Sequence, residues 1–308
     1  MTDYREAIPA ALAGERVDRI VALITGCTRA EASDLVAAGA TTVNGEVVRA
    51  KSRRLDEGDD LAVSWDEPAG PDRPRGDDTI AFAVVAEDDD ILVIDKPPGL
   101  VVHPGAGNDE GTLVNGLLAR YPEIASVGDP TRPGIVHRLD KDTSGLMMVA
   151  RSPLAYDALV AQLSARRVDR RYQALVWGHP EVSHGVIDAP IGRSTREPTR
   201  MTVSERGREA VTRYEVVERF DQPVEVALLA CKLETGRTHQ IRVHLTALGH
   251  PVVGDERYHG HRQSLVVPRL FLHAGELGFE HPVSGEARTY TSALPDDLVG
   301  VLDRLGTR

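Results

Sequence analysis

The chain has 308 residues, of which 41% are hydrophobic and 27% are charged, a balance typical of soluble globular proteins. No apolar run reaches the ~18 residues needed to span a bilayer, and the N-terminus lacks a basic stretch followed by an apolar one. The net charge of −11 argues against a surface that is basic throughout, and Cys27 and Cys231 are too few for a disulfide framework. We therefore expect a reduced, cytoplasmic protein without a membrane anchor.

The first predicted unit is a small domain at 14–66. Apolar residues at helical spacing in 15–26 predict a first helix, and a second helix is expected to end at Gly39. Asn44 and Gly45 stand between two β-prone segments, which is a strong hairpin signal. The domain is therefore expected to be two helices followed by strands.

Residues 67–79 hold three prolines and two glycines among charged residues, a composition typical of a linker. The remainder, 80–308, is predicted to be a second and larger domain. Strands outnumber helices there and do not alternate with them, so we expect an α+β fold with a mixed or antiparallel sheet. Helices are expected within 111–122 and 152–167, and strands within 80–100, 146–150, 170–178, 225–234 and 288–294.

Residues 137–150 read HRLDKDTSGLMMVA and place Asp140 between two cations, Arg138 and Lys141. One interpretation is a polar turn that leads into a buried strand. However, nearby cations favour the carboxylate over the acid, and the carboxylate is the form required of a nucleophile or a base. Asp140 is therefore a candidate catalytic residue.

The stretch DKDTS within this segment also suggests the D-x-D-x-T pattern of haloacid-dehalogenase-like phosphotransferases. In those enzymes the first Asp is the nucleophile and the second is an acid/base. The pattern requires an apolar strand directly before it, whereas the residues that precede Asp140 include His137 and Arg138. This is the weaker alternative.

A second polar stretch at 233–255 contains Arg237, His239, Arg242 and His244. The spacing of its histidines does not match a zinc site, and no Cys or Glu completes a ligand set, so no metal is expected. Arg242 alternates with apolar residues, which favours a strand that runs into a helix. From there an arginine could reach a carboxylate of another segment.

The densest basic cluster of the chain lies at 165–178, directly before Tyr172, and consists of Arg166, Arg167, Arg170 and Arg171. It is either an exposed helix end or a phosphate-contacting surface followed by a stacking aromatic residue. The glycine-rich stretch at 103–111 matches neither the dinucleotide-binding nor the Walker pattern. A nucleotide cofactor is therefore not expected.

Together these stretches resemble the RluA/RluD family of pseudouridine synthases. GIVHRLDKDTSGLMMVA at 134–150 resembles the family's central catalytic motif, RRYQALVWG at 170–178 its second motif and LETGRTHQIRVHL at 233–245 its third. The resemblance runs from about residue 80 to about 295. In addition, 16–65 resembles the small RNA-binding domain first described in ribosomal small-subunit protein four.

The resemblance implies an enzyme that converts uridine in RNA to its C-linked isomer without a cofactor. It implies that Asp140 is the catalytic carboxylate, and whether Asp140 attacks the ribose or removes a ribose proton stays open. Arg242 would pair with Asp140 and keep it ionised. Tyr172 would stack on the uracil and could serve as a base, while Arg138 would fill the space that a flipped uridine leaves.

The implied partner is 23S rRNA of the large ribosomal subunit, with a loop such as that of helix sixty-nine as the target, because unpaired bases flip at lower cost. A non-catalytic RNA-binding or ribosome-assembly factor is a third hypothesis. We expect a monomer. The further residues expected to contact RNA are His137, Lys141, Arg166, Arg167, Arg170, Arg171, Arg237 and His239, with Arg49, Lys51 and Arg53 in the small domain.

Overall fold

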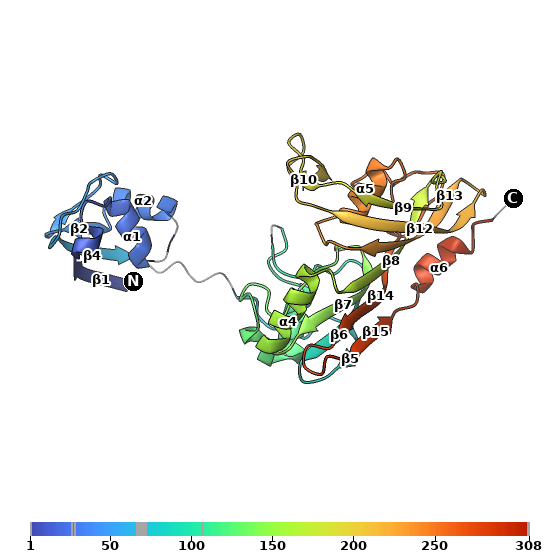
Figure 1. The fold of residues 1–308 in the computed structure, drawn as a ribbon, viewed down its shortest axis with the longest axis horizontal. Helices are drawn as coiled ribbons and strands as arrows, with labels where there is room; N and C mark the ends of the chain where they lie inside the picture. Colours follow the sequence, from blue (N-terminus) through green and yellow to red (C-terminus); the bar gives the residue numbers. More distant parts are fainter. Residues whose placement is uncertain (1, 26, 28, 66–72, 106, 307–308) are drawn as a thin grey trace. The chain divides into compact units, whose positions relative to one another are not determined.

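The structure is a computed structural model that describes residues 2–25, 27, 29–65, 73–105 and 107–306. By its internal contacts the chain divides into two units, 1–73 and 74–308, and each is described by itself (Figure 1). Within the predicted linker, 67–72 lies outside the described residues. No helix in the described ranges is long and apolar enough to cross a membrane.

The first unit packs two helices on a four-stranded antiparallel sheet of order β1-β4-β2-β3. The expected hairpin is present, because Asn44 and Gly45 adopt positive φ values of 52° and 80° between β2 and β3. The strand β1 was not predicted; it is a polar edge strand, so no apolar periodicity marks it. The elements are β1 (Thr2–Ala7), a 3-10 turn (Ala10–Leu12), α1 (Val17–Thr25), α2 (Arg29–Ala38), β2 (Thr41–Val43), β3 (Glu46–Val47) and β4 (Asp60–Trp65).

The second unit is built on a nine-stranded sheet of order β5-β6-β7-β14-β8-β13-β12-β9, with β15 paired to β14. The pair of β7 and β14 is parallel and the other pairs are antiparallel, so the predicted α+β fold with a mixed sheet is confirmed. Its strands are β5 (Ala83–Glu87), β6 (Ile91–Lys96), β7 (Ser144–Ala150), β8 (Asp169–Trp177), β9 (His184–Asp188), β12 (Val211–Phe220), β13 (Val226–Leu233), β14 (Leu272–Glu280) and β15 (Ala287–Thr291).

Helices cover both faces of this sheet. Leu92 and Ile94 of β6 pack into one apolar cluster with α3 and α5, while Ile91 and Val93 pack into another with α4. Because both faces are buried, β6 and β7 read as continuous apolar runs instead of alternating ones. The helices are α3 (Leu113–Arg120), α4 (Pro153–Ser164), α5 (Gln240–Ala247) and α6 (Asp296–Leu302), with a 3-10 turn at Pro122–Ser126 and a small hairpin of β10 (Ile191–Arg193) and β11 (Met201–Val203).

The start of α4 follows its sequence signals. The Ser152 hydroxyl accepts a hydrogen bond from the Ala155 backbone N–H at 3.2 Å, and Pro153 occupies the first helical position. Both residues are local signals for a helix start, and α4 lies within the helix expected at 152–167.

The prediction of a strand running into a helix around Arg242 is wrong, because 240–247 is helical throughout. The residues of α5 from Gln240 to Leu245 are all buried. A helix that is buried all round carries no apolar stripe, so its periodicity cannot be read from the sequence.

Candidate active site

Asp140 lies in the loop that leads into β7, and a buried lysine binds the backbone of this loop. The Lys96 ammonium, which is fully buried, donates to three backbone carbonyls, one of them that of Lys141 at 2.9 Å. The Gly99 N–H donates to the same carbonyl at 2.9 Å. Burial lowers the pKa of Lys96 to about 8, against the attraction of nearby carboxylates. The residue after Asp140 is thus fixed by two donors.

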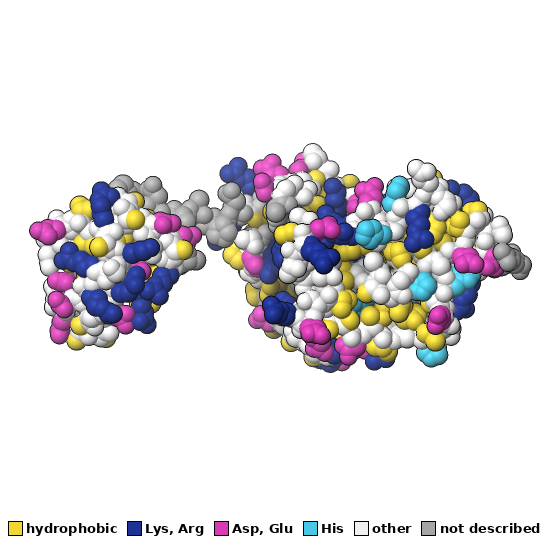
Figure 2. All heavy atoms as spheres, turned by 90° about the horizontal axis from the view of Figure 1, so that it is seen from above, with side chains coloured by type: hydrophobic (Ala, Val, Ile, Leu, Met, Phe, Trp, Pro, Cys, Tyr) yellow, Lys and Arg dark blue, Asp and Glu magenta, His cyan; other side chains and the backbone are white. Residues whose placement is uncertain are grey.

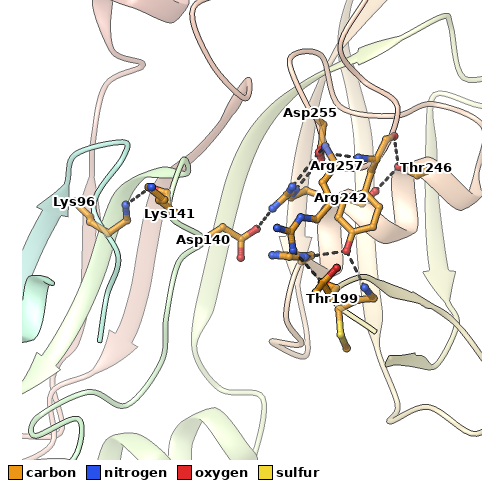
Figure 3. A network of polar contacts seen from close by, with 11 residues as sticks. Lys96, Asp140, Lys141, Thr199, Arg242, Thr246, Asp255 and Arg257 are labelled. Atoms are coloured by element: carbon orange, nitrogen blue, oxygen red, sulfur yellow. Dashed lines mark hydrogen bonds and ion pairs between the residues drawn. The ribbon is translucent and has the colours of Figure 1, made fainter. Parts of the chain in front are cut away.

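The Asp140 carboxylate faces Arg242 of α5, as Figure 3 shows. Arg242 Nη1 donates to Asp140 Oδ2 at 3.0 Å, with the two side chains 11% and 17% exposed. Oδ1 of Asp140 takes no hydrogen bond from the described residues, and Asp140 lines a cavity. One oxygen is therefore held by a cation while the other is open to a substrate.

A second carboxylate, which was not anticipated, fixes the guanidinium from the far side. Arg242 Nε and Nη2 donate to Oδ2 and Oδ1 of Asp255 at 2.7 and 2.9 Å, and the Asp255 side chain is fully buried. Burial lowers the pKa of Arg242, but the hydrogen bonds to Asp255 and the charges of both carboxylates outweigh burial and raise it. The guanidinium therefore stays charged and cannot rotate away from Asp140 without breaking a bidentate pair.

Asp255 is itself positioned by the turn that follows it. Its Oδ1 accepts the backbone N–H groups of Arg257 and Tyr258, both at 3.0 Å. The Tyr258 ring lies against the Arg242 guanidinium, with 5.1 Å from Cζ to the ring centroid. The Tyr258 hydroxyl contacts Nδ1 of His239 at 2.8 Å.

Tyr172 comes from the middle of the sheet, on β8, and its side chain is buried. Burial raises the pKa of its phenol to about 12; the charge of Arg170 works against this and that of Asp140 adds to it. The phenol is therefore protonated at neutral pH. On a strand, alternate residues face the same side, so Arg170 and Tyr172 point together while Arg171 points away.

These groups line one cavity of about 680 Å³. Asp140, Tyr172 and Arg242 all face it, although they come from a loop, a strand and a helix that lie far apart in the sequence. More arginines than acids line the cavity although the chain carries a net charge of −11. Seven arginines and three acids line it: Arg132, Arg138, Arg166, Arg170, Arg208, Arg237 and Arg242 against Asp140, Glu209 and Glu234.

The residues expected to contact RNA separate into two groups. Lys141, Arg167 and Arg171 are exposed outside the cavity lining; Arg167 pairs with Glu280 at 2.6 Å, and Arg171 pairs with two carboxylates of its own sheet. The dense arginine cluster of the sequence is therefore not one surface. The residues that line the cavity are His137, Arg138, Arg166, Arg170, Arg237 and His239.

Arg49, Lys51 and Arg53 are exposed on the first unit. Arg49 Nη1 donates to the carbonyl of Ala37 at 2.9 Å. On the face shown in Figure 2, Lys and Arg side chains gather over part of this unit.

The glycine-rich stretch, for which no function was predicted, brings His103 to the cavity. Arg138 Nη1 contacts His103 Nε2 at 2.9 Å. Burial lowers the pKa of His103, and the charge of Arg138 lowers it further, so the neutral imidazole can accept this hydrogen bond. His103 therefore helps to orient Arg138, which lies two residues before Asp140.

The phosphotransferase alternative does not fit. It requires a strand before Asp140, whereas β7 begins after it, and Ser144 stands where the pattern has Thr. Asp142, which would be the acid/base, is exposed and does not line the cavity.

Comparison with known proteins identifies the class to which this fold and cavity belong. Residues 90–247 match the model of the RNA pseudouridylate synthase family, and 15–61 match the S4 domain. A Xanthomonas campestris protein named ribosomal large subunit pseudouridine synthase D is 45% identical over 99% of this chain and 93% of its own length. Its Pseudomonas aeruginosa namesake is 43% identical, over 97% and 94%.

Among solved structures, human RNA pseudouridylate synthase domain containing 1 has a TM-score of 0.60 and 29% identity, and the match covers 74% of this chain and 89% of that one. The chain therefore belongs to the RNA pseudouridylate synthase family and carries an S4 domain at its N-terminal side. The resemblance inferred from the three motifs is confirmed.

Proposed function

We propose that this enzyme isomerises uridines in a stem-loop of 23S rRNA of the large ribosomal subunit, with Asp140 as the catalytic carboxylate and without a cofactor. The observation that carries the proposal is the Asp140 carboxylate at a basic cavity, with one oxygen bonded to Arg242 at 3.0 Å and the other open. The choice of rRNA is supported by the names of the related proteins from Xanthomonas and Pseudomonas.

The reaction breaks the bond from N1 of the uracil to C1′ of the ribose, turns the uracil and joins its C5 to C1′; C5 loses a proton and N1 gains one. Atoms and oxidation state are conserved, so an ionised carboxylate and a site that holds the detached base are sufficient. Asp140 would act on the ribose while Arg242 holds its carboxylate in place, and Tyr172 would lie against the uracil. The basic lining would draw in the RNA backbone, and a flipped loop uridine would enter at a cost of only a few kcal/mol.

The test is Asp140→Asn, assayed on a large-subunit rRNA stem-loop by chemical mapping of pseudouridine. We expect a folded protein whose turnover is lower by ~10³-fold or more, because an amide is neither a nucleophile nor a base. Asp142→Asn is the matched control: the same substitution at an exposed acid two residues away, expected to retain wild-type turnover. Wild-type rates in Asp140→Asn would refute the assignment.

A non-catalytic RNA-binding function is distinguished by the same assay. It predicts that wild-type protein binds the stem-loop without forming pseudouridine. It also predicts that a deletion strain keeps every pseudouridine of its ribosomal RNA. Loss of particular sites in that strain would support the enzyme and identify its targets.

A further inference from the structure

Arg170 is a buried cation to which the part of the chain that the structure describes offers no hydrogen-bond or ion-pair partner. Its side chain is only 6% exposed, and its Nε is buried with no hydrogen bond. Among the described residues, no ion pair or hydrogen bond engages its guanidinium. Arg242, the other buried arginine of the cavity, is held by two carboxylates, and Arg166 pairs with Glu209 at 2.6 Å. Arg170 therefore differs from both.

An unpaired buried charge is costly, and proteins normally neutralise it with an opposite charge or a bound ion. Burial lowers the pKa of Arg170 without making the guanidinium neutral at ordinary pH. Because Arg170 lines the cavity, the missing counter-charge can come from a ligand in it. In RNA the anionic groups are the phosphates, whose oxygens match the guanidinium fork.

Gly236 supplies a second, independent observation. A Cβ on this residue would lie 2.8 Å from Nη1 of Arg170, which is inside van der Waals contact. No positive φ is involved, so the contact is one of close approach: the Arg170 guanidinium lies against the bare backbone of Gly236, and a side chain there would displace it. The loop cannot move aside easily, because Gln240 Oε1 accepts the Arg237 N–H at 3.0 Å and the Thr235 hydroxyl at 2.7 Å.

The position of Arg170 on β8 sets its distance from the nucleotide that would react. Arg170 and Tyr172 are two residues apart on the same face of β8, which separates their Cα atoms by about 7 Å. If the uracil lies against Tyr172 and the ribose at Asp140, a phosphate bonded to that ribose is within reach of Arg170.

We propose that Arg170, in the space left by Gly236, binds one of the two phosphates that flank the target uridine. This inference rests on the proposed function. It assigns Arg170 to positioning the nucleotide and separates it from the neighbouring arginines of the sequence cluster.

The test replaces single phosphates of a stem-loop substrate by neutral methylphosphonates: the 5′-flanking linkage, the 3′-flanking linkage, or a linkage outside the loop as a control. For wild-type protein we expect kcat/KM to fall ~10–100-fold with one flanking substitution and to change little with the control. Arg170→Met should lose a similar factor on unmodified RNA and should then be insensitive to the methylphosphonate. Arg288→Met, an exposed strand arginine outside the cavity, should behave as wild type.

Two outcomes overturn the proposal: wild-type protein that is indifferent to both flanking methylphosphonates, or Arg170→Met that keeps the full sensitivity of wild type. The first needs no variant, so poor folding of Arg170→Met does not remove the test. If wild-type protein forms no pseudouridine in any substrate, the proposed function itself fails. If it modifies all substrates equally, only the role of Arg170 fails.

Discussion

Replacing Asp255 by Asn tests whether the buried clamp behind Arg242 serves catalysis. Asn is nearly isosteric with Asp, and its oxygen can still accept the N–H groups of Arg257 and Tyr258. Its NH₂ group, however, replaces the oxygen that accepts from Arg242 Nε at 2.7 Å, so two donors face each other. The Arg242 guanidinium therefore loses the hydrogen bond from Nε. It keeps the hydrogen bond from Nη2, but the acceptor no longer carries a negative charge.

Asp255→Asn should lower both the free energy of unfolding and kcat. A hydrogen bond to a charged group contributes about 1.5–3 kcal/mol, and removing one partner of a buried ion pair costs about 3–5 kcal/mol. Arg242 keeps Asp140 and the Tyr258 ring, so we expect a loss of about 3–5 kcal/mol in the free energy of unfolding. A guanidinium displaced by about 1 Å should lower kcat by ~10²-fold, with KM within a few-fold because Asp255 is buried away from the cavity.

The assay combines denaturant unfolding with steady-state kinetics well below the unfolding transition. Asp297→Asn is the matched control, since Asp297 accepts the same two nitrogens of Arg269 at 2.7 and 3.1 Å but is 39% exposed and outside the cavity. This pair is only partly buried, with side chains 10% and 39% exposed, so its loss should cost less than the loss of the fully buried Asp255 carboxylate. If Asp255→Asn loses no more stability than this control and keeps its kcat, the clamp has no catalytic function.

Two further predictions concern protons. Tyr172→Phe keeps the ring, so KM should stay nearly unchanged while kcat falls by ~10²-fold or more. The kcat of the wild-type protein should also rise with pH as the phenol, with its pKa of about 12, begins to ionise. Equal rates in the two proteins would exclude a chemical role for the hydroxyl. For His244, burial lowers the pKa below 6.5, so the unfolded state takes up the proton first. Its contribution to stability is complete above about pH 6.5 and is lost as pH falls below that value, at up to about 1.4 kcal/mol per pH unit. His244→Gln should show a shallower loss than wild type in unfolding measurements from pH 7.5 to 5.5, and identical slopes would contradict this.

The elements that the sequence predicted correctly are those with local signals. A side-chain cap and a proline begin α4, and Asn44 and Gly45 form the hairpin turn, because these residues select a backbone conformation by themselves. Asp140 could be singled out for a related reason, because it stands between Arg138 and Lys141 in the sequence. Such features do not depend on the rest of the fold.

The elements that were missed depend on contacts that are distant in sequence. The helix α5 is enclosed by the sheet and by neighbouring loops, so its pattern carried no helical stripe. Asp255 belonged to a stretch that was recognised, yet nothing local showed that its side chain turns back to Arg242. The arginine cluster was treated as one surface because the alternation of a strand was not applied across Arg170 and Arg171.

The net charge of −11 and an anionic substrate are compatible because the acids and bases are distributed unequally. Outside the cavity, arginines such as Arg167 and Arg269 are neutralised by carboxylates. Inside it, seven arginines face three acids, and the arginines remain in excess although Asp255 and Asp129, which lie outside the lining, pair with Arg242 and Arg132. A cleft with low-dielectric walls focuses such an excess on the molecule that enters it. The charge that an RNA would meet in the cavity is therefore that of the arginines around Asp140, which the net charge of the chain does not show.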